Sequence, residues 1–198
     1  MKIFFLNHLT SLLLITTILS LNHCAQVVTG TAAKVVTVSK EDRSIGEFVD
    51  DTLIKTFIKN SYFDQNEKIF FNVDVEVSLG RVLLTGTVEN IDLKIEATRL
   101  AWGAEGVKTV INEIQISNSD NILNFADDLV ISTKVLGKLM LDENINSLNY
   151  NIETVNKIVY IIGISLSDKE KNNVIKIAQD VFGVVEVIDY ITVKTSNI

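Results

Sequence analysis

A repeat with a period of 77 residues constrains this 198-residue chain more than any other feature of its sequence. When the sequence is aligned with itself at that offset, no gap is needed and identical residues meet at many positions. The identical pairs include Asp51 with Asp128, Thr56 with Thr133, Asn72 with Asn149, Glu76 with Glu153, Gly86 with Gly163, and Gly106 with Gly183. A repeat of this length predicts two copies of one structural unit. We expect one module at 51–117 and another at 128–194, joined by a linker at 118–127.

The first segment of each module has the apolar spacing of a helix. In the second module, residues 127–142 place Ile131, Val135 and Leu139 four positions apart, so that they share one side of a helix. An acidic residue just before such a segment is a common N-cap, and we expect Asp127 or Asp128 to fill that role.

Strand patterns and a second helix follow. In the first module, residues 71–77 alternate apolar and polar side chains from Phe71 onward, which indicates a strand. Gly80-Arg81 predicts a turn, after which we expect a strand at 82–88, a helix at 91–104 and a last strand at 107–116. The predicted order is helix, strand, strand, helix, strand. It favours an α+β fold in which helices cover one face of a three-stranded mixed sheet.

Four glycines repeat between the modules, and we interpret all of them as structural. Gly86 and Gly163 fall at predicted strand ends. Gly106 and Gly183 fall at predicted helix ends, where a residue with positive φ commonly stops the helix.

The N-terminal segment has the form of a signal peptide. Lys2 is followed by a largely apolar stretch that is short for a membrane span, and the only cysteine, Cys24, comes just after it. The sequence Leu21-Asn22-His23-Cys24 resembles a bacterial lipoprotein box. This resemblance implies removal of residues 1–23, acylation of Cys24 with diacylglyceryl and a further chain such as palmitate, and a lipidated linker at 24–50. The alternatives are an ordinary cleaved signal and an uncleaved anchor.

Composition excludes several classes of function. A net charge of −7 without a basic run argues against a nucleic-acid partner. One cysteine cannot form an internal disulfide, and no Cys/His spacing indicates a metal site, so we expect no cofactor. Both histidines, His8 and His23, precede the predicted cleavage point. With no phosphate-binding loop either, we expect no catalytic residues and no enzyme. The single tryptophan, Trp102, is interpreted as a partly buried core residue.

The motifs of both modules resemble the BON family of bacterial envelope proteins. The matching stretches are "GRVLLTGTV" and "EGVKTVINEIQI" in the first module, and "KIVYIIGISLSDKEK" and "FGVVEVIDYITV" in the second. Upstream, "DRSIG" and "VDD" are similar to the linker of dual-module envelope lipoproteins. The resemblance implies a non-enzymatic outer-membrane lipoprotein that faces the periplasm, binds anionic phospholipid and supports envelope integrity.

One helix face is the candidate lipid-binding site. Lys134 and Lys138 are one turn apart, and Val130 and Leu141 fall on the same side of the helix. A solvated face with extended lysine stems is one interpretation. A membrane-surface patch is the other, and the resemblance implies it for Val130, Lys134, Lys138 and Leu141, because dual-module members bind phospholipid through this helix. Two other functions remain open: a tethered adaptor that binds an envelope protein, and a soluble periplasmic osmotic-stress protein.

Overall fold

The computed structural model describes residues 44–117 and 122–194, all of which belong to one compact unit spanning Ser39–Ile198. The predictions for the signal peptide, for Cys24 and for most of the linker at 24–50 lie outside the described residues. We call the part from α3 to β4 the first module and the part from α6 to β7 the second module.

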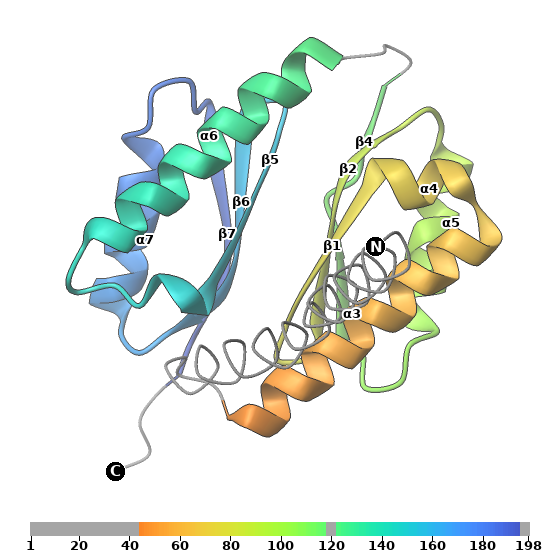
Figure 1. Ribbon diagram of the computed structural model, residues 1–198, viewed down its shortest axis with the longest axis horizontal. Helices are drawn as coiled ribbons and strands as arrows, with labels where there is room; N and C mark the ends of the chain where they lie inside the picture. The colour runs from red at the N-terminus through yellow and green to blue at the C-terminus, as the bar shows by residue number, and fades with distance from the viewer. Residues whose placement is uncertain (1–43, 118–121, 195–198) are drawn as a thin grey trace, which may run out of the picture. The chain divides into compact units, whose positions relative to one another are not determined.

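Each module has the predicted order of elements, with one short helix added (Figure 1). The first module consists of α3 (Ile45–Gln65), α4 (Glu67–Asn72), β1 (Val73–Ser78), β2 (Arg81–Val88), α5 (Ile91–Trp102), β3 (Thr109–Asn112) and β4 (Gln115–Ile116). The second consists of α6 (Ile122–Leu141), the 3-10 turn η2 (Ser147–Asn149), β5 (Tyr150–Val155), β6 (Ile158–Ser165), α7 (Asp168–Gln179) and β7 (Glu186–Val193).

The two sheets have the same topology. In each, the first two strands form an antiparallel hairpin and the last strand adds in parallel to the second, so the sheet is mixed. The pairing register repeats as well: Val73 lies opposite Gly86 in the first module, and Tyr150 lies opposite Gly163 in the second. The α+β fold class predicted from the sequence is therefore confirmed.

Helices cover one face of each sheet and bury a core of small and β-branched side chains. In the first module, Ile54 and Ile58 of α3 and Ala97 and Ala101 of α5 pack on the inward residues of β1 and β2. In the second module, the core includes the predicted stripe of α6, whose members are Ile131, Val135 and Leu139. Alanines on α5 and α7 let these helices lie close to the sheet.

The predicted capping role of Asp127 or Asp128 is wrong, because α6 begins at Ile122, upstream of both. Asp128 instead accepts hydrogen bonds from the backbone N–H groups of Asn156 and Lys157, at 2.7 and 2.8 Å. Asp51 accepts the equivalent pair from Leu79 and Gly80. All four turn residues have positive φ, which is the geometry of a tight hairpin. Each buried aspartate therefore stabilises a strained turn from the adjacent helix.

Several other boundaries differ from the predictions. Phe71, predicted to begin a strand, lies in the last turn of α4 and is exposed, because Asn66 caps a new helix by accepting from the N–H groups of Lys68 and Ile69. The first hairpin turn lies at Leu79-Gly80 rather than at Gly80-Arg81. Trp102 is half exposed at the end of α5 and does not belong to the core.

The last strand of the first module begins at Thr109 and is interrupted after Asn112, whereas β7 is continuous. The side chain of Asn112 accepts a hydrogen bond from the N–H of Ile114, 3.1 Å away, and this local turn breaks the ladder.

The repeated glycines are displaced slightly from their predicted places. Gly106 and Gly183 have the expected positive φ, 89° and 100°, but lie in the loops after α5 and α7, whose last residues are Trp102 and Gln179. Gly86 and Gly163 lie inside β2 and β6 rather than at their ends.

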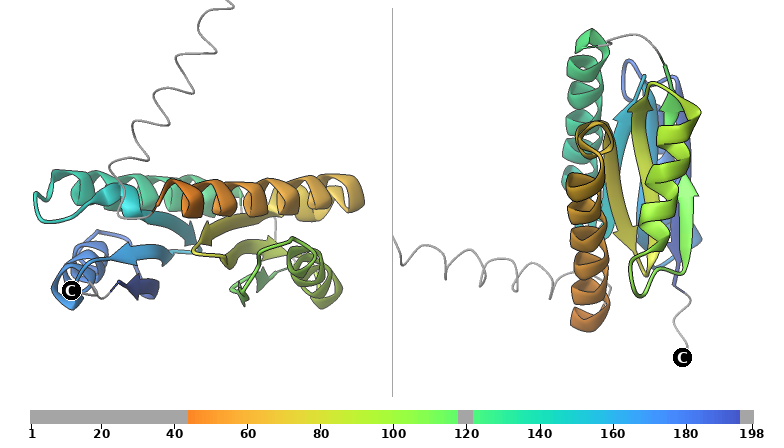
Figure 2. Two further views of the ribbon diagram at one scale, coloured as in Figure 1. Left: turned by 90° about the horizontal axis from the view of Figure 1, so that it is seen from below. Right: turned by 90° about the vertical axis from the view of Figure 1, so that its right-hand side faces the viewer.

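The two sheets pack on each other through the faces that point away from the helices (Figures 1 and 2). Leu83, Tyr160 and Ile162 form the buried centre of this contact, with Ile111 and Ile188 packed around them. Leu83 and Tyr160 are 77 residues apart, as are Ile111 and Ile188, so both modules contribute the same face. This is the arrangement of a two-fold symmetric interface, formed here within one chain.

Polar contacts fix the register of the two sheets. Arg81 donates to the carbonyl of Tyr190 at 2.8 Å and to the hydroxyl of Thr192 at 2.7 Å. The Tyr190 hydroxyl donates to Glu113, which is its own equivalent in the repeat. Burial raises the pKa of Tyr190, and the hydrogen bond to Glu113 with its negative charge adds to the effect, while the charge of Arg81 opposes it.

Candidate functional site

Helix α6 presents the four predicted lipid-binding residues on its outer side. Its buried stripe faces the sheet, so side chains on the opposite side project into solvent. Val130 is 48% exposed, Leu141 is 85% exposed, and Lys134 and Lys138 are both exposed. Neither lysine has an ion pair within the described residues. The structure therefore brings the four together on an accessible face and leaves both ammonium groups available to an anion.

The outer side of α6 carries more apolar surface than the sequence analysis identified. Leu129 and Met140 are exposed beside the four residues, and so are Phe125 and Leu136. At 100° per residue these side chains fall on the flank away from Lys134 and Lys138. The helix thus has a predominantly apolar flank and a mixed apolar and basic flank. We call the outer residues of α6 the α6 face: Phe125, Leu129, Val130, Lys134, Leu136, Lys138, Met140 and Leu141.

The loop between α7 and β7 extends this surface. Phe182 is 92% exposed and Val185 is 76% exposed. The N–H of Val185 donates to the carbonyl of Lys157 at 2.9 Å, and the N–H of Lys157 donates to Asp128 on α6. These contacts place the loop beside the first half of α6. The sequence analysis missed both residues, although an aromatic next to the loop glycine Gly183 was a signal for an exposed apolar tip.

Electrostatics around the α6 face are mixed. Asp127 lies on the same helix, and its carboxylate is 3.9 Å from the ammonium group of Lys157. At the other end, the pKa of Asp142 is lowered, first by the hydrogen bond that it accepts from the N–H of Asn144 and then by the side chain of Asn173. The cationic part of the face is therefore confined to Lys134 and Lys138 near its middle.

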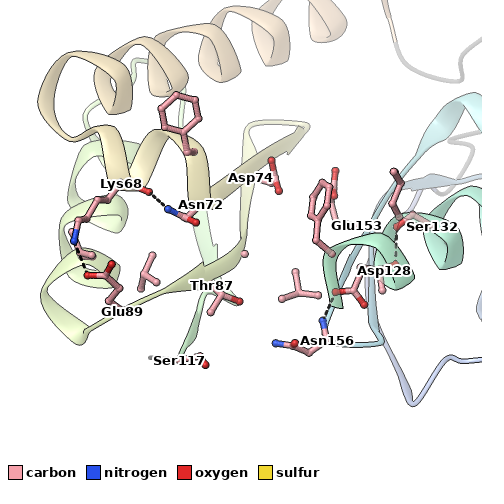
Figure 3. Close-up of a pocket in the computed structure, with 18 of the residues that line it drawn as sticks. Lys68, Asn72, Asp74, Thr87, Glu89, Ser117, Asp128, Ser132, Glu153 and Asn156 are labelled. Atoms are coloured by element: carbon pink, nitrogen blue, oxygen red, sulfur yellow. Dashed lines mark hydrogen bonds and ion pairs between the residues drawn. The ribbon is translucent and has the colours of Figure 1, made fainter. Parts of the chain in front are cut away.

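A hollow of about 890 Å³ lies beside this helix, lined by residues of both modules (Figure 3). Its polar side chains largely bind one another: Lys68 contacts Glu89 at 2.7 Å, and Asp128 accepts from the N–H of Asn156. Glu153, like Asp74, forms no hydrogen bond or ion pair within the described residues. Burial raises the pKa of Glu153 to about 7, and the negative charges of Asp74 and Glu76 add to the effect.

The described residues contain neither a metal-binding cluster nor a membrane-spanning helix. No group of three or more His, Cys, Asp or Glu side chains is placed to hold a metal ion in 44–117 or 122–194. Within the same ranges, no helix is both long and apolar enough to span a bilayer. The predicted lipidation site, Cys24, lies outside them.

Sequence comparisons identify the repeated unit. The BON domain matches twice, at residues 50–118 and 127–195. An uncharacterized protein from the gshII 5′ region of Anaplasma centrale is 40% identical over 151 residues, which cover 76% of this chain and 99% of that protein.

Two further relatives have descriptive names. The outer membrane lipoprotein DolP of Haemophilus influenzae is 30% identical, over 85% of this chain and 87% of that one. The osmotically-inducible protein Y of Escherichia coli is 26% identical, over 71% of each. Since the BON domain accounts for both halves of the repeat, this chain belongs to the BON family, as a member with two tandem BON domains.

Proposed function

We propose that the protein is a lipid-anchored, periplasm-facing protein of the outer membrane whose second module contacts anionic phospholipid and so supports envelope integrity. The α6 face makes the contact: Val130 and Leu141 enter the headgroup region, and Lys134 and Lys138 meet the phosphates. The protein acts by binding, without turnover. The single observation that carries this proposal is the exposure of those two apolar residues beside two lysines that have no ion pair in the described part of the chain.

The neighbouring loop strengthens the proposed contact. Phe182 and Val185 lie beside α6 and are highly exposed, so they add apolar area that can enter the same interface. An exposed aromatic is favoured at the level of the headgroups. The similarity to an outer membrane lipoprotein supports the proposed location.

Affinity from the α6 face alone is modest. Each lysine near an anionic surface contributes about 1 kcal/mol, and the chain as a whole carries a net charge of −7. Acylation of Cys24 would hold the module at the membrane and raise its local concentration there. Mass spectrometry of the membrane-extracted protein tests this part: we expect an N-terminal, acylated Cys24, and an intact N-terminus would contradict it.

Vesicle flotation tests the contact itself. The compact unit, Ser39–Ile198 without the acylated terminus, should float with vesicles that contain phosphatidylglycerol and should not float with purely zwitterionic vesicles. The variant K134E/K138E should lose this binding. A matched variant, K169E/K176E, makes the same charge change at two exposed lysines of α7 and should retain it. Equal loss in both variants would show that only net charge matters and would reject the α6 face as the site.

A second function is favoured by one observation, the similarity to an osmotically-inducible protein. If the compact unit binds no vesicle of any composition, a soluble or protein-binding role in osmotic stress replaces the lipid contact. In that case the K134E/K138E variant should complement loss of the gene under osmotic shock as well as the wild type does.

A further inference from the structure

The first module has an exposed apolar stripe on α3. Ile45, Val49, Leu53 and Phe57 recur every four residues, and all four are exposed on the outer side of the helix. Leu53 is 63% exposed and Phe57 is 49% exposed, although both are large apolar side chains. Exposed apolar residues that are contiguous along a helix mark an interaction surface more often than scattered ones do.

The C-terminal part of this stripe borders a groove of about 920 Å³. Leu53, Ile54 and Phe57 form its apolar side. The opposite side consists of two backbone loops, the β1–β2 turn and the segment between α5 and β3, which the 2.8 Å hydrogen bond from the N–H of Lys108 to the carbonyl of Gly80 holds together. The walls are therefore a helix and a pair of hydrogen-bonded loops, and the volume lies in the range of pockets that hold a drug-sized ligand, which is room for several side chains of a bound chain. We call this the α3 groove.

The rim of the α3 groove is acidic. Its charged residues are Glu47, Asp50, Asp51, Glu105 and one cation, Lys108. Two of the carboxylates are occupied: Glu47 pairs with Lys194 at 3.1 Å, and Asp51 accepts from the β1–β2 turn. Asp50 and Glu105 are exposed and have no ion pair within 44–117 and 122–194. These two carboxylates, on opposite sides of the groove, are available to a cation.

The repeat shows that part of this chemistry is specific to the first module. Asp127, the equivalent of Asp50, pairs with Lys157 at 3.9 Å, whereas Gly80 takes the place of that lysine in the first module. Leu53 and Phe57 are equivalent to Val130 and Lys134, while Glu105 is equivalent to Phe182. Where the second module presents a cation and an exposed apolar tip, the first presents an aromatic ring and a carboxylate. An anionic membrane repels such a rim, whereas a cationic chain with apolar anchors complements it.

We propose that the α3 groove docks a cationic amphipathic segment of another protein. Its apolar side chains would pack on Leu53 and Phe57, and its lysines or arginines would meet Asp50 and Glu105. Binding of an amphipathic helix in an apolar groove is a common mode of peptide recognition, with anchors spaced at i, i+3, i+4 and i+7. This docking is independent of the lipid contact proposed for the second module.

The test uses a synthetic helical peptide with leucines at i, i+3, i+4 and i+7 and lysines elsewhere, titrated into the compact unit. The variant D50K/E105K should weaken binding by about tenfold or more, since two charge contacts become repulsive. The variant D64K/D180K makes the same charge change at exposed residues outside the groove and should bind as the wild type does. A peptide with glutamates in place of the lysines should not bind.

A second variant tests the apolar contact with the peptide separately from the charge contacts. Phe57→Ser leaves the rim unchanged and should also weaken peptide binding severalfold, because the apolar anchor is lost. Equal affinity in D50K/E105K and D64K/D180K would overturn the proposal, as would peptide binding that Phe57→Ser leaves unchanged. Loss of vesicle flotation in Phe57→Ser would identify the groove as a membrane face instead. None of these outcomes depends on K134E/K138E, so failure here leaves the lipid proposal standing.

Discussion

Lys55 and Glu76 form an ion pair at 2.6 Å in the first module, whereas Glu153, the equivalent of Glu76, faces Ser132 at the position of Lys55. Ser132 bonds Thr154 at 2.7 Å and supplies no charge. The same carboxylate is therefore ion-paired in the first module, whereas in the second module it has no ion pair within the described residues. The pKa of Glu153 rises accordingly, while the buried positions around it keep their apolar character.

The same division holds over the whole repeat. Residues that determine the backbone conformation are the same in both modules. Asp51 and Asp128 accept hydrogen bonds from the N–H groups of their hairpin turns. Gly86 and Gly163 each lie so close to a backbone carbonyl oxygen that no side chain would fit. Exposed positions have diverged, and Phe57 against Lys134 is the clearest case. The same physical requirements therefore fix the fold of both modules. The outer helix faces are not under these requirements and can bind different partners.

The largest effect should come from the shared glycines. An added Cβ would lie 2.1 Å from the Asn72 carbonyl at Gly86 and 2.2 Å from the Asn149 carbonyl at Gly163. Both Gly86→Ala and Gly163→Ala should lower the free energy of unfolding by about 3 kcal/mol or more. Gly86→Ala should cost more, because Gly86 also has a φ of 112° whereas Gly163 does not have positive φ.

Denaturant unfolding followed by circular dichroism measures these changes. Gly137→Ala, in the middle of α6 with open space around it, is the control and should stabilise the protein by about 0.5–1 kcal/mol. If Gly163→Ala proves as mild as the control, the close approach of β5 to β6 does not constrain the second module.

The next largest effect should come from the contact between the sheets. Leu83 is buried against Tyr160 and Ile162 rather than in either helix-covered core. Leu83→Ala should lower the free energy of unfolding by about 2–3 kcal/mol and should uncouple the modules, giving two thermal transitions in calorimetry. The conservative change Leu83→Met should retain one transition. A single transition in Leu83→Ala would show that the modules cooperate by some other route.

Local patterns were sufficient to predict most of the fold. The four-residue spacing of Ile131, Val135 and Leu139 gave the buried side of α6, and the exposed positions of Val130 and Leu141 follow from it. Asp128 could not be placed, because an aspartate near a helix start has the same local pattern whether it caps the helix or reaches another turn. Its partners, Asn156 and Lys157, are 28 and 29 residues away.

Features that depend on tertiary contacts could not be predicted from these local sequence patterns. The exposure of Phe182 depends on where its loop meets α6, and the packing of Leu83 against Tyr160 depends on how two sheets meet. An apolar residue on the strand face opposite the helices is buried only if a second layer covers it. Neither periodicity nor propensity contains that information, so the α6 face could be predicted in part and the sheet contact could not.

Glu153, which has no ion pair in 44–117 or 122–194, predicts a pH dependence. Its pKa is raised from 4.5 to about 7 in the folded protein, by burial first and then by Asp74 and Glu76, with Lys55 and Lys59 opposing. The folded state therefore binds more protons than the unfolded state between these values, and stability should fall as pH rises from about 4.5 to about 7. The loss should be on the order of 1–2 kcal/mol, after allowance for solvent.

Three variants test the role of the Glu153 carboxylate. Glu153→Gln should remove the pH-dependent loss, so that it exceeds the wild type in stability at pH 8 and matches it at pH 4. Ser132→Lys restores the cation that the first module has at Lys55, and it should shift the titration of Glu153 toward its ordinary range. Glu76→Gln, by contrast, should destabilise at pH 8, because it leaves Lys55 unpaired. Parallel pH profiles for the wild type and Glu153→Gln would contradict the assignment.

The smallest effect should come from adding a tryptophan to the outer face of α6 or of α3, which compares the vesicle binding of the two helices directly. Val130 is half exposed at the edge of the α6 face, so Val130→Trp should fit without disturbing the core and should add an aromatic that favours the membrane interface. Flotation with phosphatidylglycerol vesicles should strengthen severalfold, equivalent to about 1 kcal/mol or less, and thermal stability should stay within about 0.5 kcal/mol of the wild type. Leu53→Trp makes the same change at the equivalent position of the first module, where Phe57 and Ser61 take the places of Lys134 and Lys138. It should leave vesicle binding unchanged, since the acidic rim keeps that face away from an anionic surface. If both tryptophans strengthened flotation equally, the aromatic ring alone would account for the stronger binding. The difference in charge between the two modules would then not determine which partner each module binds.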